Sequence, residues 1–223
     1  MADTRAALRR WIADPWPVLG AWTLGAIAVS AGLLSATWIV ASIVTPDPTP
    51  VFIHGLTYPA DLGDFGYLIG NNLIVLALHA TACVAGFMAG SSMPRVASSM
   101  TGFSRFVHEK AGPIAIWWVV IVTTFSLLTQ AFALGVTGSA IAGQLGISPA
   151  LLIVTVLPHA MVELTAIFLP LAAWIIASRR DRWEELLAAT ALTVAVAVPM
   201  IVIAAAVEIL VWPETLRAVS PVL

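Results

Sequence analysis

Two ionisable side chains lie four residues apart in the middle of a long apolar stretch of this chain. His159 and Glu163 belong to the run 147–177, which contains no other charged residue. A spacing of four places both side chains on one face of a helix. An imidazole and a carboxylate so placed could bind a metal ion, pass a proton, or join helices through hydrogen bonds. Pro158 precedes the histidine and lacks a backbone N–H, so we predict a helix that is kinked or broken at this residue.

Other polar residues lie in separate apolar segments and are expected to join this pair. An ionisable group inside a bilayer is costly unless it is compensated, and it is therefore a functional-site candidate. The predicted intramembrane polar cluster comprises His159, Glu163, His79, Asn71, Asn72, Gln130 and Glu208.

These residues leave three interpretations open. A catalytic metal site needs at least three protein ligands, but the sequence lacks both the His-Glu-x-x-His motif and a cysteine pair, since Cys83 is its one cysteine. A proton or ion path would use His159 and Glu163 with the neighbouring amide side chains. We favour the third interpretation, a hydrogen-bonded cluster that locks helices together, and we expect no metal and no cofactor.

The composition determines the class of protein that must position these side chains. Of the 223 residues, 60% are hydrophobic and 10% are charged, whereas an average soluble domain carries about 25% charged residues. The mean hydropathy is +0.98. The chain is therefore expected to be an integral membrane protein with a single transmembrane domain and no separate soluble module.

Five apolar segments are long enough to cross a bilayer, because about 20 apolar residues span its hydrocarbon core. With a cytoplasmic N-terminus, nine of the ten Lys and Arg residues fall on the cytoplasmic side, and only Arg217 lies outside. The predicted fold class is all-α, a polytopic membrane helix bundle. Its predicted spans are about 17–44, 66–90, 113–142, 148–178 and 186–212.

The segments outside the spans follow from this topology. Residues 1–16 are predicted to be a cytoplasmic interfacial segment, either a short helix or only a charged leader. The loop 45–64 is rich in proline and acidic residues and is predicted to be extracytoplasmic, as is the tail 214–223. The loop 91–112 contains Arg95, Arg105 and Lys110 and is predicted to be cytoplasmic.

Small residues in the second span predict close helix packing. Gly86 and Gly90 form a Gly-x-x-x-Gly pair, which lets a second helix approach closely. Together with Pro158, they are the predicted helix-packing positions.

Several short motifs occur together between about Asn71 and Pro213. They are Asn71-Asn72, the Gly86 and Gly90 pair, the small-residue stretch 135–143, Leu157-Pro158-His159-x-x-x-Glu163-Leu164-x-Ala166, and Glu208. This set resembles the stage II sporulation protein M family, and the Leu-Pro-His-x-x-x-Glu element is its most specific part. The chain departs from the family at Ala160 and Thr165, where the family usually has Gly and Pro. The resemblance implies a cell-membrane protein whose founding member joins cell-wall-degrading enzymes in a complex that drives engulfment.

The function expected from these observations is a non-enzymatic scaffold or subunit of a cell-envelope complex in the plasma membrane, linked to peptidoglycan remodelling. The expected partners are the lipid bilayer, other membrane or cell-wall-associated proteins, and a second copy of the chain. Nucleic acid is not expected, because the basic residues are few and lie beside the membrane. The alternative is an ion- or proton-coupled transporter or channel that uses His159 and Glu163. An intramembrane enzyme would need water to reach these residues.

Overall fold

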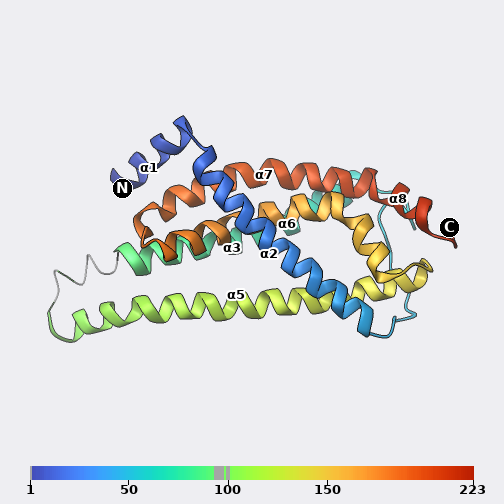
Figure 1. Cartoon of the computed structure of the whole chain (residues 1–223), viewed down its shortest axis with the longest axis horizontal. Coiled ribbons are helices and arrows are strands. Elements are labelled where there is room, and N and C mark those ends of the chain that lie inside the picture. The colour runs from blue at the N-terminus through green and yellow to red at the C-terminus, as the bar shows by residue number, and fades with distance from the viewer. Residues whose placement is uncertain (1, 93–97, 99–100) are drawn as a thin grey trace.

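The computed structural model describes residues 2–92, 98 and 101–223, and every regular element in this part is helical. Figure 1 shows the elements as a bundle of long helices with shorter helices at its two ends. In chain order they are α1 (Ala2–Ala13), α2 (Trp16–Ile43), α3 (Leu62–Phe87), the π-helix η1 (Met88–Ser92), α5 (Gly102–Gln144), α6 (Pro149–Arg179), the 3₁₀-helix η2 (Trp183–Glu185), α7 (Leu186–Leu210) and α8 (Trp212–Val219).

Five helical segments are long and apolar enough to cross a membrane, as the sequence predicts. Each contains a window of mean hydropathy 1.9 or higher. Their bounds are Trp16–Ile43, Leu62–Ser91, Ile116–Gln144, Pro149–Arg179 and Trp183–Val219. The chain is therefore a multi-pass helical membrane protein.

The centre of the bundle is α6, which contacts α2, α3 and α7. Its second half is buried without interruption from Leu164 to Trp174. Phe168, which is fully buried, lies at the heart of the largest apolar cluster. Helices in a bilayer associate through such close packing, because lipid chains are as apolar as the side chains themselves.

The predicted kink or break at Pro158 is wrong, because α6 is one continuous helix from Pro149 to Arg179 with Pro158 inside it. The missing N–H removes a single backbone bond, while the neighbouring helices hold the rest of α6 in place. The chain bends instead at Val211, between α7 and α8. Pro213 lies two residues later, in the first turn of α8, and it cannot donate the next bond of the α7 ladder.

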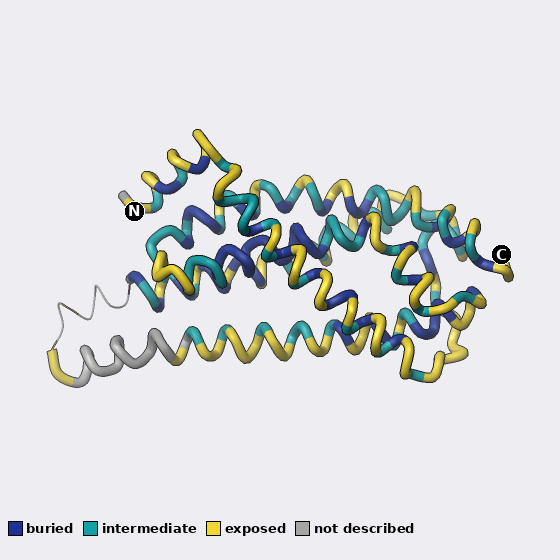
Figure 2. Tube along the Cα trace, in the orientation of Figure 1, coloured by how far each residue is buried: buried dark blue, intermediate teal, exposed yellow. Residues whose placement is uncertain are grey.

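Helix α5 begins earlier than the sequence suggests. It starts at Gly102 and passes through positions 112 and 113, where glycine and proline had favoured the end of a loop. One missing backbone bond does not end a helix of 43 residues. The prediction for Arg95 lies outside the described residues. Figure 2 shows that α5 is exposed along much of its length, with burial concentrated near its C-terminal end.

Close packing of α5 against α2 is confined to that C-terminal end. A Cβ atom at Gly135 would lie 2.5 Å from the Val40 Cβ, and one at Gly143 would lie 2.9 Å from the Pro46 Cβ. Only glycine permits this approach of α5 to α2 at Val40 and to Pro46 in the loop that follows α2. The rest of the transmembrane part of α5 faces away from the bundle or packs against it loosely.

Polar contacts build an ordered cap over the end of the bundle that carries α8. Ser139 Oγ donates to the Val44 carbonyl at 2.9 Å, and Ser220 Oγ donates to the Leu145 carbonyl at 2.8 Å. Gln144 bonds the loop 44–61 twice, at the Thr49 carbonyl and the Val51 N–H. The cap therefore joins the α2–α3 loop, the α5–α6 turn and the C-terminus.

The opposite end is closed by α1, which forms the short helix that was one of the two predictions for this segment. Trp11 packs edge-on against Trp22 with ring centroids 5.2 Å apart, and Arg10 forms a 2.7 Å ion pair with Glu185. The N-terminal helix is thus fastened to α2 and η2.

Candidate intramembrane site

A cavity of about 230 Å³ lies beneath the cap, and three ionisable side chains line it. His159 and Glu163 reach it from α6, and Glu208 reaches it from the end of α7. Most of the remaining wall is apolar. Further lining residues come from α2, α5, α6 and α8 and include Leu34, Thr37, Leu134, Gly138, Ile153 and Trp212.

His159 is held by an aromatic neighbour. It is buried, and its ring lies 5.4 Å from the Trp212 ring, centroid to centroid, at a tilt of 56°. Trp212 is positioned in turn by its Nε1–H, which donates to Thr155 Oγ1 at 3.2 Å. Thr155 donates its own hydroxyl to the Leu152 carbonyl. The start of α8 therefore fixes one wall of the cavity.

Glu163 lies one turn further along α6 and faces different groups. Asn72 of α3 and Glu208 of α7 both lie close enough to interact with its carboxyl group. The structure thus brings together four of the predicted polar residues: His159, Glu163, Glu208 and Asn72. Among the described contacts, no hydrogen bond or ion pair joins His159 directly to Glu163.

The other predicted members of the cluster lie elsewhere. His79 is buried but bonds the Val75 carbonyl at 2.9 Å and packs edge-on against Phe168. Gln130 donates to Ser126 on its own helix at 3.0 Å, and Asn71 is exposed on α3. In the described part of the chain, no group of three His, Cys, Asp or Glu residues is arranged to hold a metal ion.

The predicted packing glycines accommodate tryptophan rings. A Cβ atom at Gly86 would lie 2.6 Å from Trp174 Nε1, and one at Gly90 would overlap the Trp183 ring. The Gly-x-x-x-Gly pair, with Gly86 in α3 and Gly90 in η1, therefore makes room for tryptophan side chains of α6 and η2. Pro158, the third predicted packing position, is exposed on α6.

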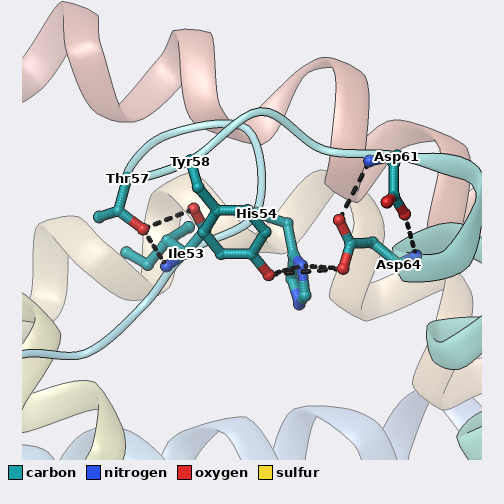
Figure 3. A network of polar contacts seen from close by, with 6 residues as sticks. All are labelled: Ile53, His54, Thr57, Tyr58, Asp61 and Asp64. Carbon is teal, nitrogen blue, oxygen red and sulfur yellow. Dashed lines mark hydrogen bonds and ion pairs between the residues drawn. The ribbon is translucent and has the colours of Figure 1, made fainter.

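Sequence reasoning missed a second polar group, which lies in the α2–α3 loop and at the start of α3. His54 Nδ1 lies 3.0 Å from Asp64 Oδ1, and the Tyr58 hydroxyl contacts both residues (Figure 3). Asp61 and Asp64 cap α3 through reciprocal bonds to each other's backbone N–H. This Asp-x-x-Asp spacing is a helix-start signal that could have identified Asp64 as an ordered residue.

The loop group lies near the end of α7 that carries Glu208. Glu208 is close enough for electrostatic interaction with His54 as well as with Glu163, but no hydrogen bond or ion pair of the described residues joins His54 to Glu208. Ionisable groups therefore follow one another from Asp64 and Tyr58 in the cap, past His54 and Glu208, to Glu163. Partial burial, followed by the negative charge of Asp64, raises the pKa of the Tyr58 hydroxyl.

The fold defines a class: a multi-pass helical membrane protein, here with a cavity among its helices that three ionisable side chains line. Residues 112–213 match the family model of Stage II sporulation protein M, which confirms the resemblance inferred from the motifs. The matched segment contains His159, Glu163 and Glu208, whereas Asn71, Asn72, Gly86 and Gly90 precede it. No curated protein and no solved structure matches the chain.

Proposed function

We propose that this protein moves a proton or a small cation across the plasma membrane, with Glu163 as the central binding group. The supporting observation is the cavity of about 230 Å³ that His159, Glu163 and Glu208 share. No described hydrogen bond or ion pair joins these three groups to one another. A cavity of this size has room for water or a small ion. Intramembrane carboxylates beside such cavities are typical of proton relays and ion sites.

The electrostatics of the site favour a cation or proton as the occupant. Two carboxyl groups, Glu163 and Glu208, interact across an apolar-walled cavity. Like charges in such surroundings repel, and a proton or cation between them relieves that repulsion. Asn72 supplies a neutral partner that can stay bonded to Glu163 in either state.

The test is proton flux into liposomes that contain the purified protein and a trapped pH-sensitive dye, driven by a potassium diffusion potential. We expect the wild type to conduct. Glu163→Gln removes the exchangeable proton with little change in size, and it should reduce the flux to that of protein-free liposomes. Glu184→Gln, the same change in η2 at the opposite end of the bundle, is the matched control and should conduct like the wild type. Wild-type flux equal to that of empty liposomes would refute the proposal, as would normal conduction by Glu163→Gln.

A second candidate function, a non-catalytic subunit of a cell-envelope complex, is favoured by α5. Trp117, Phe125 and Phe132 are each more than 60% exposed on this helix, whereas Ser126 and Gln130 form a short polar pair on it. The polar pair lies on the half-buried side of α5, and the exposed aromatic rings offer a partner helix a surface for close packing. The resemblance to stage II sporulation protein M adds the expectation of partners that remodel peptidoglycan.

This role can be tested with a photo-crosslinking amino acid placed at Phe125 in native membranes. A crosslinked protein band is expected at Phe125. The same probe at Ile203, which is 59% exposed on α7, serves as the control position. Equal crosslinking at the two positions, or none at Phe125, would count against a specific partner on α5.

A further inference from the structure

The turn that carries His54 rests directly on the end of α7. Gly55 has a left-handed backbone, with φ of +74°, and a Cβ atom at this residue would lie 2.9 Å from Pro213 Cγ and 3.2 Å from the Ile209 carbonyl oxygen. Arg217 of α8 donates a hydrogen bond to the Gly55 carbonyl. Because Ile209 follows Glu208 in the chain, this contact places the His54 turn beside the end of α7 that carries Glu208.

The partners of the His54 ring determine which of its nitrogens can exchange a proton. Both Asp64 Oδ1 and the Tyr58 hydroxyl contact Nδ1. A carboxylate at Nδ1 favours the tautomer with the proton on that nitrogen, so that Nε2 carries the free lone pair. A nucleophile–base–acid triad would instead place its nucleophile and its acid on opposite ring nitrogens. The group is therefore built to exchange protons and not to activate Tyr58 as a nucleophile.

The surroundings of His54 are acidic on both sides. Asp64 and Asp61 lie at the start of α3, and Glu208 lies at the end of α7. Among the described residues, the basic side chain that contacts the turn is Arg217, which is also paired with Glu214. The side chain of His54 is 28% exposed and that of Asp64 is 20% exposed, so solvent reaches both of them.

We propose that His54 is the proton-exchange group that connects Glu208 with the water at the predicted extracytoplasmic face. A water molecule between the two groups carries the proton. The O–H bond of the protonated Glu208 carboxyl breaks as this water takes up its proton, and an O–H bond of the same water breaks as an N–H bond forms at Nε2 of His54. The imidazolium, stabilised by the Asp64 carboxylate, then releases this proton to water and regenerates the starting tautomer. The inference rests on the proposed proton movement and names the group through which the proton leaves at the extracytoplasmic side.

Tyr58 is excluded as the exchanging group in this scheme. Its raised pKa keeps the phenol protonated at neutral pH, so the hydroxyl serves as a fixed hydrogen-bonding group beside the ring. The hydroxyl holds His54 and Asp64 together in the network of Figure 3. Loss of this hydroxyl in Tyr58→Phe should therefore reduce proton exchange less than loss of the imidazole does.

The experiment uses the fact that Cys83 is buried, with its Sγ–H donating to the Pro170 carbonyl. In His54→Cys the introduced thiol is therefore the reactive one. The flux assay compares this variant untreated, treated with a thiol reagent that carries an imidazole, and treated with a size-matched reagent that carries a benzyl group. Reagent-treated wild type shows whether Cys83 is affected, and Tyr58→Phe keeps the imidazole but removes one of its contacts.

We expect His54→Cys to lower the flux by about tenfold or more, since a positioned proton-transfer group contributes roughly 10²–10⁴ in rate. The imidazole reagent should restore most of the flux and the benzyl reagent should not, a difference that a purely structural role would not produce. Equal flux in His54→Cys and wild type, with Glu163→Gln inactive, would overturn this inference and leave the proposed function standing. Equal rescue by both reagents would also overturn it. Absence of flux in the wild type would refute the proposed function, and this inference with it.

Discussion

Replacement of Gly55 by alanine should detach the loop turn from the end of α7. A left-handed backbone costs a non-glycine residue roughly 1–2 kcal/mol. The added Cβ would also lie within 2.9 Å of Pro213 Cγ and 3.2 Å of the Ile209 carbonyl oxygen. Overpacking of this kind typically costs about 1–3 kcal/mol. The sum, about 2–5 kcal/mol, corresponds to an increase of roughly 30-fold or more in the population of the opened turn.

Amide hydrogen exchange of the detergent-solubilised protein measures this opening directly. The amides of Gly55, Leu56 and Thr57 bond to carbonyls within the turn at 2.9 to 3.1 Å. Their exchange should accelerate about 30-fold or more in Gly55→Ala, because exchange through local opening follows the free energy of that opening. Gly55→Asn should show a smaller increase, since asparagine tolerates the left-handed conformation but still introduces the Cβ.

The matched control is Gly66→Ala on α3, where an added Cβ meets nothing within 4 Å. This change should leave exchange in the turn at the wild-type rate and slightly favour the helix, by about 0.5–1 kcal/mol. Wild-type exchange rates at positions 55–57 in Gly55→Ala would refute the reasoning. They would mean that the turn does not rest on Pro213 and that His54 is not held near Glu208.

Two further predictions concern packing and pH. Gly135→Ala should lower the stability of the detergent-solubilised protein by about 1–3 kcal/mol, because the added Cβ would force α5 and α2 apart at Val40. The control is Gly32→Ala on α2, where an added Cβ meets nothing within 4 Å and the stability should not fall. Equal thermal unfolding of the two variants would contradict the packing argument. The raised pKa of Tyr58 favours the protonated phenol in the folded cap, so its contribution is complete below about pH 10 and is lost as the pH rises through the folded-state pKa. Amide hydrogen exchange in the cap, corrected for its intrinsic pH dependence, should therefore accelerate above about pH 10 in the wild type but not in Tyr58→Phe. Identical dependence of the exchange rate on pH in the two proteins would exclude this role for Tyr58.

Local properties of the chain were sufficient to predict the fold class and part of the site. The five spans follow from apolar runs of sufficient length, and these are read from neighbouring residues alone. The helical period placed His159 and Glu163 at one cavity, as their spacing predicts. The same local reasoning failed at Pro158 and at the start of α5. There, neighbouring helices and helix length outweigh the loss of one backbone bond.

Hydropathy and periodicity are properties of adjacent residues, and they were enough to predict a multi-pass helical membrane protein with ionisable groups in its apolar spans. Which of those groups meet depends on the tertiary packing of the helices. It separated His79, Gln130 and Asn71 from Glu163, and it joined Glu163 to Asn72 and Glu208. It also brought His54 of a proline-rich loop close to the end of α7, because Gly55 packs against Pro213. These contacts depend on how distant helices pack, and no short-range pattern in the sequence encodes them.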